Sequence, residues 1–291
     1  MALSPQDLTH LSVLAVFAHP DDEGFGFGGT LAMLAARGAR ITLVCATNGD
    51  VGEISDPSLA TPENLYQVRQ EELRRAMKVT GVQDVRFLGY RDSGMDGTPD
   101  NGHPRSLHQA PPDEVVAKLV EIIRERRPEV VFTHDPTGGY GHPDHVTVHQ
   151  RTVRAFEAAG DGDVLKGQLS GNLQSGTPQF LYYVCFPRRN FRKMWERMAE
   201  LGIEPPFASL EVDKIGSPDE AVSTTIDVSP YVETKRASLA CHRTQMNANG
   251  PFSQLPEDMM REIMSTEYFT LAVSQGEDSG TDILAGMAEL E

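Results

Sequence analysis

The first residues of this chain that could do chemistry stand directly after an apolar run. Residues 11–18 read LSVLAVFA, and they are followed at once by His19, Pro20, Asp21, Asp22 and Glu23. One imidazole and three carboxylates in so short a segment are costly to bury without partners. Histidine nitrogen and carboxylate oxygen suit a divalent metal, with zinc first among the candidates. Because Pro20 favours a tight turn, His19 and Asp22 can converge on one point.

A second cluster of the same composition follows a second apolar run. After residues 130–134 (VVFTH) the chain reads GGYGHPDH over 138–145, and it then has helical apolar spacing to about Ala159. Two such clusters can supply three ligands and leave one coordination position open, which is typical of a catalytic zinc site. The alternative for both clusters is a plain helix N-terminus, which also favours acidic residues.

Both clusters stand where buried strands are expected to end. Near-continuous apolar runs are typical of strands buried on both faces, as in a parallel sheet. In open α/β sheets, ligands bind at the carboxyl ends of the strands. Strand, turn and helix patterns recur along residues 11–160. We therefore expect an α/β fold with a doubly wound, mostly parallel, Rossmann-like sheet and helices on both faces.

The whole chain, 1–291, is expected to form a single α/β domain. Its core spans residues 11–160, and a C-terminal extension over 178–273 completes the fold. Within this extension the pattern predicts a helix over 230–245. Residues 274–291 are rich in glycine and acidic residues, so we expect a frayed tail there. No internal repeat and no linker divides the chain.

Composition limits the partners and the compartment. The formal net charge of −16 argues against nucleic acid or an anionic membrane surface as a partner. No apolar stretch approaches the length of a transmembrane helix, and the N-terminus lacks the basic region of a signal peptide. Cys45, Cys185 and Cys241 show neither metal nor redox spacing, so we expect free thiols and a cytoplasmic location. Assembly into a homo-oligomer is left open.

The motifs AHPDDE at 18–23 and HPDH at 142–145 resemble those of the LmbE-like family of zinc de-N-acetylases. This family includes the N-acetylglucosaminyl-phosphatidylinositol (PIG-L) deacetylases and the mycothiol and bacillithiol pathway deacetylases. Similarity to the thiol-pathway enzymes extends to TNGDVGE at 47–53, RDSGMDGT at 91–98 and GGYGHPDH. The resemblance covers residues 11–160 well. It implies a metal-dependent hydrolase that removes the acetyl group from a small N-acetylglucosamine conjugate, with zinc as cofactor, although iron(II) would also suit the ligands.

The resemblance implies roles for the residues of both clusters. His19, Asp22 and His145 match the three metal ligands of the family. Asp21 lies next to a ligand but is spare, so we expect it to take a proton from the attacking water and later return it to the amine. His142 is expected to stabilise the tetrahedral oxyanion, best as the imidazolium. The metal would lower the pKa of its water to about 7 and polarise the acetyl carbonyl.

Further residues are expected to complete the site. Asp144 would hold the second ring nitrogen of His142, the role that carboxylates play for histidines generally. Tyr140 lies in a glycine-rich segment from which its phenol could reach the oxyanion or the substrate. Three residues match positions that line the substrate pocket in the mycothiol-type enzymes: Asp50, Arg69 and Asp92. A surface salt bridge is the alternative for each of these three.

Three more histidines are left without a definite role. His149 lies one turn beyond His145, but a fourth protein ligand would close the metal site, so we expect a supporting role for it. His134 stands where the nearest relatives tend to carry tyrosine. His242 either lines the pocket or is a buried structural histidine.

Three other functions are compatible with parts of this sequence. An amidase that cleaves thiol S-conjugates would use the same site. A non-catalytic metal-binding module would need no spare carboxylate such as Asp21. A nucleotide-binding oxidoreductase is suggested by Gly24-x-Gly26-x-x-Gly29, with Asp50 placed like a ribose-binding acid. Polar residues and a proline separate these glycines from the strand, so close packing of the helix on the sheet explains them better.

Overall fold

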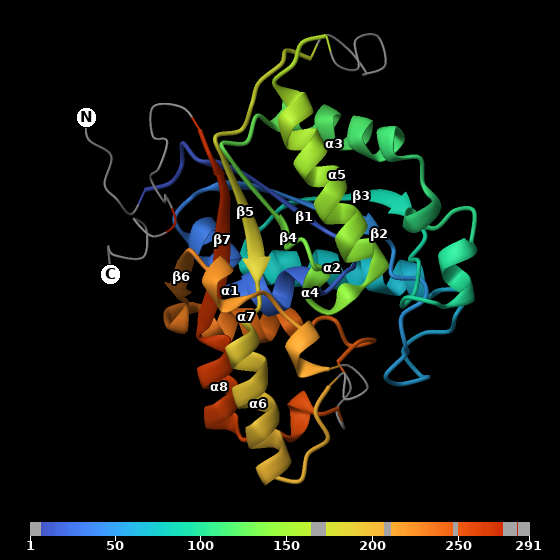
Figure 1. The fold of residues 1–291 in the computed structure, drawn as a ribbon, viewed down its shortest axis with the longest axis vertical. Coiled ribbons are helices and arrows are strands. Elements are labelled where there is room, and N and C mark those ends of the chain that lie inside the picture. Colours follow the sequence, from blue (N-terminus) through green and yellow to red (C-terminus); the bar gives the residue numbers. More distant parts are fainter. Residues whose placement is uncertain (1–6, 164–172, 207–210, 247–249, 276–283, 285–291) are drawn as a thin grey trace.

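The computed structural model describes residues 7–163, 173–206, 211–246, 250–275 and 284. These residues build a seven-stranded sheet in the order β3-β2-β1-β4-β5-β7-β6, with helices on both faces (Figure 1). The strands are β1 (Ser12–Phe17), β2 (Arg40–Thr47), β3 (Asp84–Tyr90), β4 (Val130–His134), β5 (Phe180–Cys185), β6 (Thr224–Asp227) and β7 (Thr266–Ser274).

The sheet is mostly parallel, as the buried apolar runs predict. Strands β1 to β5 pair in parallel, and β7 runs antiparallel to both β5 and β6. From β1 the chain moves outward through β2 to β3 and then returns to β4 on the other side of β1. The order therefore reverses between β1 and β4, and the carboxyl ends of these two strands form the crevice where such folds bind ligands. The expected doubly wound α/β fold is confirmed.

The described part of the chain contains eight α-helices. They are α1 (Asp22–Ala36), α2 (Leu65–Thr80), α3 (Pro112–Arg126), α4 (Gly138–Gly141), α5 (Pro143–Ala159), α6 (Arg188–Glu200), α7 (Val232–Leu239) and α8 (Glu257–Met264). Helices α1 and α2 pack on one face of the sheet, and α3 and α5 pack on the other.

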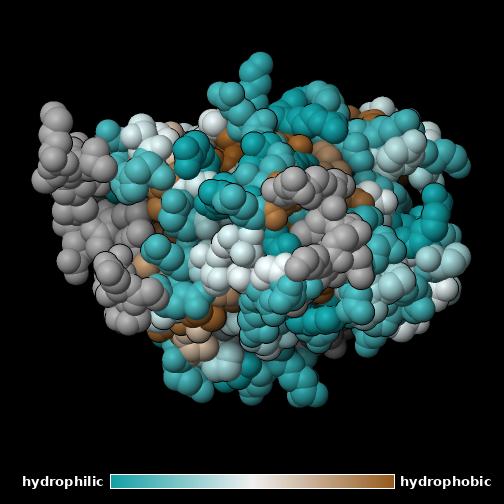
Figure 2. All heavy atoms as spheres, turned by 90° about the horizontal axis from the view of Figure 1, so that it is seen from above, coloured by the Kyte–Doolittle hydropathy of each residue, from teal (hydrophilic) through white to brown (hydrophobic). Residues whose placement is uncertain are grey.

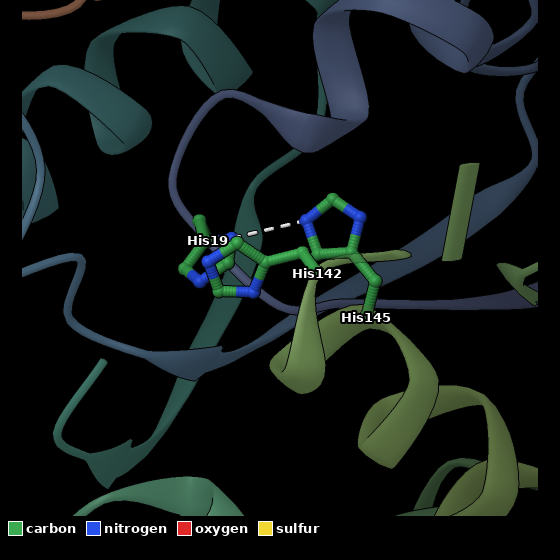
Figure 3. Close-up of side chains that lie close together, drawn as sticks. All are labelled: His19, His142 and His145. Carbon is green, nitrogen blue, oxygen red and sulfur yellow. Dashed lines mark hydrogen bonds between the residues drawn. The ribbon is translucent and has the colours of Figure 1, made fainter. Parts of the chain in front are cut away.

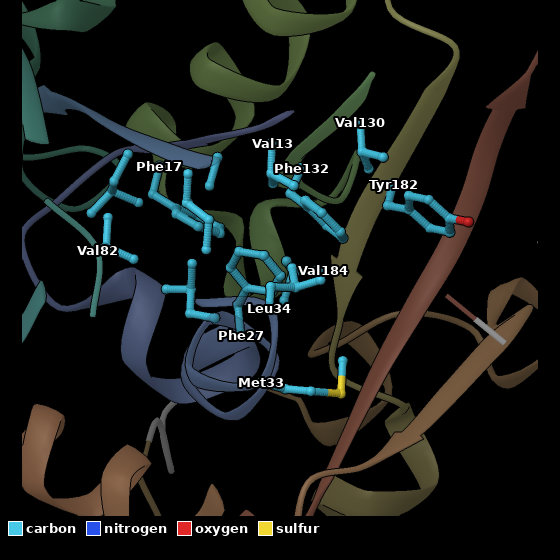
Figure 4. Packing of buried hydrophobic residues seen from close by; sticks show 14 of the residues in the cluster. Val13, Phe17, Phe27, Met33, Leu34, Val82, Val130, Phe132, Tyr182 and Val184 are labelled. Atoms are coloured by element: carbon cyan, nitrogen blue, oxygen red, sulfur yellow. The ribbon is translucent and has the colours of Figure 1, made fainter. Parts of the chain in front are cut away.

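Two apolar cores explain why the strands are apolar on both sides. Along β1, Val13 and Phe17 face the core under α1, and the alternate residues Leu14 and Val16 face the core under α3 and α5. In the first core the ring of Phe27 from α1 packs against the strands beside it (Figure 4). The sheet is therefore anchored on both faces, and the strand ends that carry polar residues are held in fixed positions.

The glycines of α1 serve close packing. A Cβ atom at Gly24 would lie 2.5 Å from the Leu239 side chain of α7, and one at Gly26 would lie 2.5 Å from Val184 of β5. These distances are too short for any larger side chain. Close packing accounts for these glycines, as expected, although the partner at Gly24 is a helix and not the sheet.

The C-terminal part differs from expectation at one helix. The pattern predicts a helix over 230–245, but α7 ends at Leu239. Beyond Leu239 the chain leaves the helix, and His242 and Thr244 form hydrogen bonds to Glu23 in α1 and Glu72 in α2. Most of the expected tail, 276–283 and 285–291, lies outside the described residues.

The face in Figure 2 is mostly hydrophilic, with apolar residues in small separate groups. Six large apolar side chains are exposed in the described part of the chain: Phe25, Tyr66, Val79, Met95, Leu201 and Ile263. Among the described helices, none combines the length and the apolar character that crossing a membrane requires.

Candidate metal centre and active site

The three residues that match the metal ligands of the family come together at the crevice between β1 and β4. His19 follows β1, Asp22 begins α1, and His145 lies in the first turn of α5. His19 Nδ1 lies 3.1 Å from His145 Nε2 (Figure 3). The Asp22 carboxylate lies 3.4 Å from the first of these nitrogens and 3.2 Å from the second. All three side chains are largely buried.

The outer nitrogens of both rings determine where the lone pairs point. His145 Nδ1 lies 3.1 Å from the Gly138 carbonyl oxygen, so this nitrogen carries the hydrogen. His19 Nε2 lies 3.2 Å from a carboxylate oxygen of Asp144 and 3.6 Å from one of Asp92, so it too carries a hydrogen. The lone pairs of the two rings therefore point at each other and at the third ligand. Three acceptors so close together repel unless a positive charge lies between them, and this donor set fits a divalent cation.

The electrostatics of the cluster also favour a positive charge. Burial acts to lower the pKa of His19, yet the carboxylates of Asp92 and Asp144 raise it well above its ordinary value. Burial acts to raise the pKa of Asp22, yet the surrounding histidines hold it well below its usual range. A cluster with these shifts takes up a proton when no cation balances its carboxylates.

Asp144 supports His19 and not His142, which corrects an expectation. Its carboxylate accepts hydrogen bonds from the main-chain N–H of Ser93 at 2.9 Å and from the Ser93 hydroxyl, and it faces His19 Nε2. The reason is local geometry, because the first turn of α5 directs this buried side chain toward the end of β1. Only the main-chain N–H of Asp144 serves His142, at 3.1 Å from Nδ1. Ser93 lies inside the RDSGMDGT motif, but nothing in that motif alone indicates its contact with Asp144.

His142 is a neutral donor, not the expected imidazolium. Its ring caps the N-terminus of α5 and stands edge-on to His19, with ring centroids 4.5 Å apart. Burial and the neighbouring His19 and His145 rings lower the pKa of His142 to about 3. Because Nδ1 accepts a hydrogen bond, the single ring hydrogen is on Nε2. His142 can therefore donate one hydrogen bond without being charged.

Asp21 occupies an unusual backbone conformation beside the ligands. Its φ angle is +121°, in the region that L residues rarely adopt. Its carboxylate lies 3.2 Å from Arg69 Nη2, and its side chain is 17% exposed. Burial raises the pKa of Asp21 to about 6, although Arg69 acts to lower it. A carboxylate with a pKa near neutrality suits general acid–base chemistry.

The residues matched to the substrate pocket have partners in the structure. Arg69 is buried and donates to the carbonyl oxygens of Pro20, at 2.6 Å, and Gly49, at 3.0 Å. It therefore lies behind Asp21 and binds the chain around it. The buried carboxylate of Asp92 accepts from the Gly94 N–H at 2.8 Å beside His19. Asp50 accepts from the Asp92 N–H at 2.9 Å.

Tyr140 joins the site from a strained turn. Its ring centroid lies 5.1 Å from that of His145 and 6.1 Å from that of His142. The preceding Gly139 has φ +73° and ψ −65°, and its N–H donates to the Asp135 carboxylate at 3.0 Å. The Ser217 hydroxyl donates to the same carboxylate at 2.5 Å. The Asp135 carboxylate thus links the turn that carries Tyr140 to the segment around Ser217.

The other two histidines without an assigned role, His149 and His134, lie next to the site, and His134 Nε2 is 3.4 Å from the Asp22 carboxylate. His149 uses Nδ1 to contact the His134 carbonyl oxygen at 2.9 Å. His134 Nε2 accepts from the Ala18 N–H at 3.1 Å, and its ring stacks on His145 with centroids 4.0 Å apart. Burial lowers the pKa of His134 to about 4, so its ring is neutral.

The third histidine, His242, is fully buried and contacts Glu23, two residues after Asp21. Its Nε2 lies 2.8 Å from Glu23 Oε1. No local sequence signal could have revealed this pair, because its members lie in distant parts of the chain.

Comparisons with known proteins agree with the two motifs. Residues 14–156 match the family described as GlcNAc-PI de-N-acetylase (PIG-L). A 1D-myo-inositol 2-acetamido-2-deoxy-alpha-D-glucopyranoside deacetylase of Geodermatophilus obscurus is 41% identical over 290 residues, covering 94% of this chain and 97% of the relative. The enzyme of the same name from Thermobifida fusca is 43% identical, covering 89% of this chain and 92% of the relative.

Solved structures share the fold at lower identity. N,N'-diacetylchitobiose deacetylase from Pyrococcus horikoshii, in complex with its inhibitor MPG, superposes with a TM-score of 0.65. The match covers 90% of this chain and 84% of that chain, at 21% identity. At this identity the likeness shows a common fold only.

Proposed function

The chain belongs to the GlcNAc-PI de-N-acetylase (PIG-L) family, and we propose that it removes the acetyl group from 1D-myo-inositol 2-acetamido-2-deoxy-alpha-D-glucopyranoside. Relatives of that name are about as long as this chain and match nearly all of it. The observation that carries the proposal is the convergence of His19, Asp22 and His145 with a carboxylate, Asp21, beside them that has no place among the ligands.

His19, Asp22 and His145 would hold a divalent cation, for which we propose zinc. When bound, zinc would acidify a water molecule and polarise the acetyl carbonyl. The ring hydrogens on the outer nitrogens of both histidines, held by the Gly138 carbonyl oxygen and the Asp144 carboxylate, keep the ligating nitrogens directed inward.

The side chains around the ligands would supply the proton transfers and stabilise the oxyanion. Asp21 takes a proton from the attacking water and delivers it to the nitrogen as the bond between the acetyl carbon and the amine breaks. His142 donates a hydrogen bond from Nε2 to the tetrahedral oxyanion, and the Tyr140 phenol donates a second one. The products are acetate and the free amino sugar.

Acidic residues at the crevice suit a neutral polyol substrate. Asp50 and Asp92 lie beside the metal cluster and would accept hydrogen bonds from sugar hydroxyls. Arg69 contributes indirectly, because its donors hold Asp21 and the loops around it. Cys45, Cys185 and Cys241 are free thiols, which supports our proposal that the enzyme works in the reducing cytoplasm.

Amine release from a panel of substrates tests the proposed substrate. The panel contains N-acetylglucosaminyl inositol, N-acetylglucosaminyl malate, diacetylchitobiose and the S-conjugate of an amino-sugar thiol. We expect the highest kcat/KM on the inositol conjugate. A higher kcat/KM on the S-conjugate would show instead that the chain is an amidase that uses the same site.

A further inference from the structure

The positive φ angle of Asp21 has to be stabilised by contacts with other residues. Asp21 and Arg127 are the two non-glycine residues with positive φ in the described part of the chain. At φ +121° a side chain is strained, and such a conformation persists only where surrounding contacts impose it. Because Asp21 is the general base of the proposed reaction, whatever imposes this conformation also aims the base.

Glu23 makes the contact that holds this turn. Its Oε2 accepts the main-chain N–H of Asp21 at 3.0 Å. Its Oε1 lies 2.8 Å from His242 Nε2, and both side chains are at most 1% exposed. In the described part of the chain the other ring nitrogen, Nδ1, has no hydrogen-bond partner. The polar contact of the buried ring is therefore directed at Glu23 alone.

The fold brings His242 to this place by close helix packing and a bend. At Gly24, beside Glu23, the absence of a side chain lets Leu239 of α7 approach α1. After α7 ends, the chain bends and Thr244 donates to Glu72 of α2 from its N–H at 2.9 Å and its hydroxyl at 2.6 Å. Helix α2 also carries Arg69, which pairs with the Asp21 carboxylate. One C-terminal segment thus contacts both helices that support Asp21.

We propose that Glu23 and His242 form a positioning pair that holds the general base Asp21 in its left-handed conformation. Glu23 fixes the main chain of Asp21, Arg69 fixes its carboxylate, and His242 fixes Glu23. This inference rests on the role of Asp21 in the proposed function. A purely structural pair would stabilise the start of α1 without affecting turnover.

The first experiment compares Glu23→Ala with a matched buried carboxylate. Glu267 also accepts main-chain N–H groups of α1, from Gly29 and Thr30 at 2.8 Å, and it pairs with the buried Lys235. We expect Glu23→Ala and Glu267→Ala both to lower Tm. Only Glu23→Ala should lower kcat, by about 10²-fold, the cost of misplacing a catalytic group by about 1 Å, with KM and metal content unchanged.

Glu23→Gln provides the rescue, because its amide oxygen can still accept the Asp21 N–H. It should retain most of the kcat that Glu23→Ala loses. In the background Asp21→Asn, adding Glu23→Ala should change kcat little, because the group that it positions is already absent. Equal losses of kcat in Glu23→Ala and Glu267→Ala, or additive losses with Asp21→Asn, would overturn the inference. If Asp21→Asn alone keeps full activity, the proposed catalytic role of Asp21 fails instead.

A stability measurement tests the same idea without substrate. Glycine adopts positive φ freely, so Asp21→Gly removes the strain that Glu23 is inferred to balance. Glu23→Ala should therefore lower Tm less in the Asp21→Gly background than in the wild-type chain. The same decrease in both backgrounds would mean that Glu23 does not hold the turn.

Discussion

Two segments of this chain carry the same three residues, His-Pro-Asp, and use them in different ways. In the first, His19 is one of the three converging side chains that we propose as metal ligands, and Asp21 lies beside them. In the second, His142 caps α5 beside the cluster and Asp144 is fully buried against His19. In our proposal the first segment thus provides a metal ligand and a general base. The second offers a donor and a carboxylate that orients a ligand of the first.

The difference comes from the backbone after each proline. Asp21 turns through positive φ, so its carboxylate stays partly exposed next to Arg69. Pro143 instead begins a regular helix, which points Asp144 into the protein, where Ser93 binds it. Residue type and spacing therefore indicate where a site lies, whereas the local backbone conformation determines which groups each side chain can contact.

The largest difference between the two segments is expected when the histidine of each, His19 or His142, is replaced by alanine. His19→Ala should lose bound metal and activity together, because two remaining ligands hold zinc poorly. His142→Ala should keep the metal and lose about 10²–10³-fold in kcat, the usual cost of one oxyanion donor. Elemental analysis and kinetics of both variants check this, with His149→Ala as a control that keeps the metal. Metal loss in His142→Ala would show that the two segments are more alike than the structure indicates.

The next largest effect concerns the first aspartate. Asp21→Asn should keep the metal and reduce kcat by about 10²–10⁴-fold, the range typical of general acid–base catalysis. The reason is that an amide cannot take the proton of water. Near-normal kcat at saturating substrate would reduce Asp21 to a structural residue.

The second aspartate should affect metal binding more than chemistry. Asp144→Asn weakens the hydrogen bond that the Nε2–H group of His19 donates to residue 144. Metal affinity should therefore fall by about 10–100-fold, as is typical for partners of ligating histidines. Competition with a chelator measures this affinity. Activity should recover when the variant is assayed in excess zinc. An unchanged affinity with reduced kcat would favour the original expectation that Asp144 serves His142.

The sequence predicts which side chains come together between β1 and β4, but it does not predict most of the hydrogen bonds around them. Apolar runs identify the ends of β1 and β4. Of the proposed ligands, His19 and Asp22 follow β1 within five residues, whereas His145 lies eleven residues beyond the end of β4. The partner of Asp144 could not be predicted, because Ser93 comes from a loop after β3 whose path depends on the whole sheet. The positive φ of Asp21 could not be predicted from the sequence, because such a conformation is expected at glycine and not at aspartate. The contact of His242 with Glu23 depends on where α7 ends.

The smallest effect concerns the pH profile. Asp21 has its pKa raised to about 6 by burial, against the lowering effect of Arg69. Protonation of Asp21 removes the base, so kcat/KM should fall as the pH falls through this region. Arg69→Gln removes the positive charge that lowers the pKa of Asp21, so the acidic limb should move to higher pH. Arg69→Lys keeps the charge and should leave the limb closer to its wild-type pH. A limb that stays in place or moves to lower pH in Arg69→Gln would contradict this assignment.

Zinc reconstitution tests the central claim most directly, that His19, Asp22 and His145 hold one catalytic cation. The wild-type protein is stripped with a chelator, dialysed, and titrated with zinc while bound metal and deacetylation are measured together. We expect stripped protein to be inactive and activity to return in proportion to bound metal, up to one ion per chain. Full activity in the stripped protein, or failure to bind zinc again while the protein remains folded, would contradict the account.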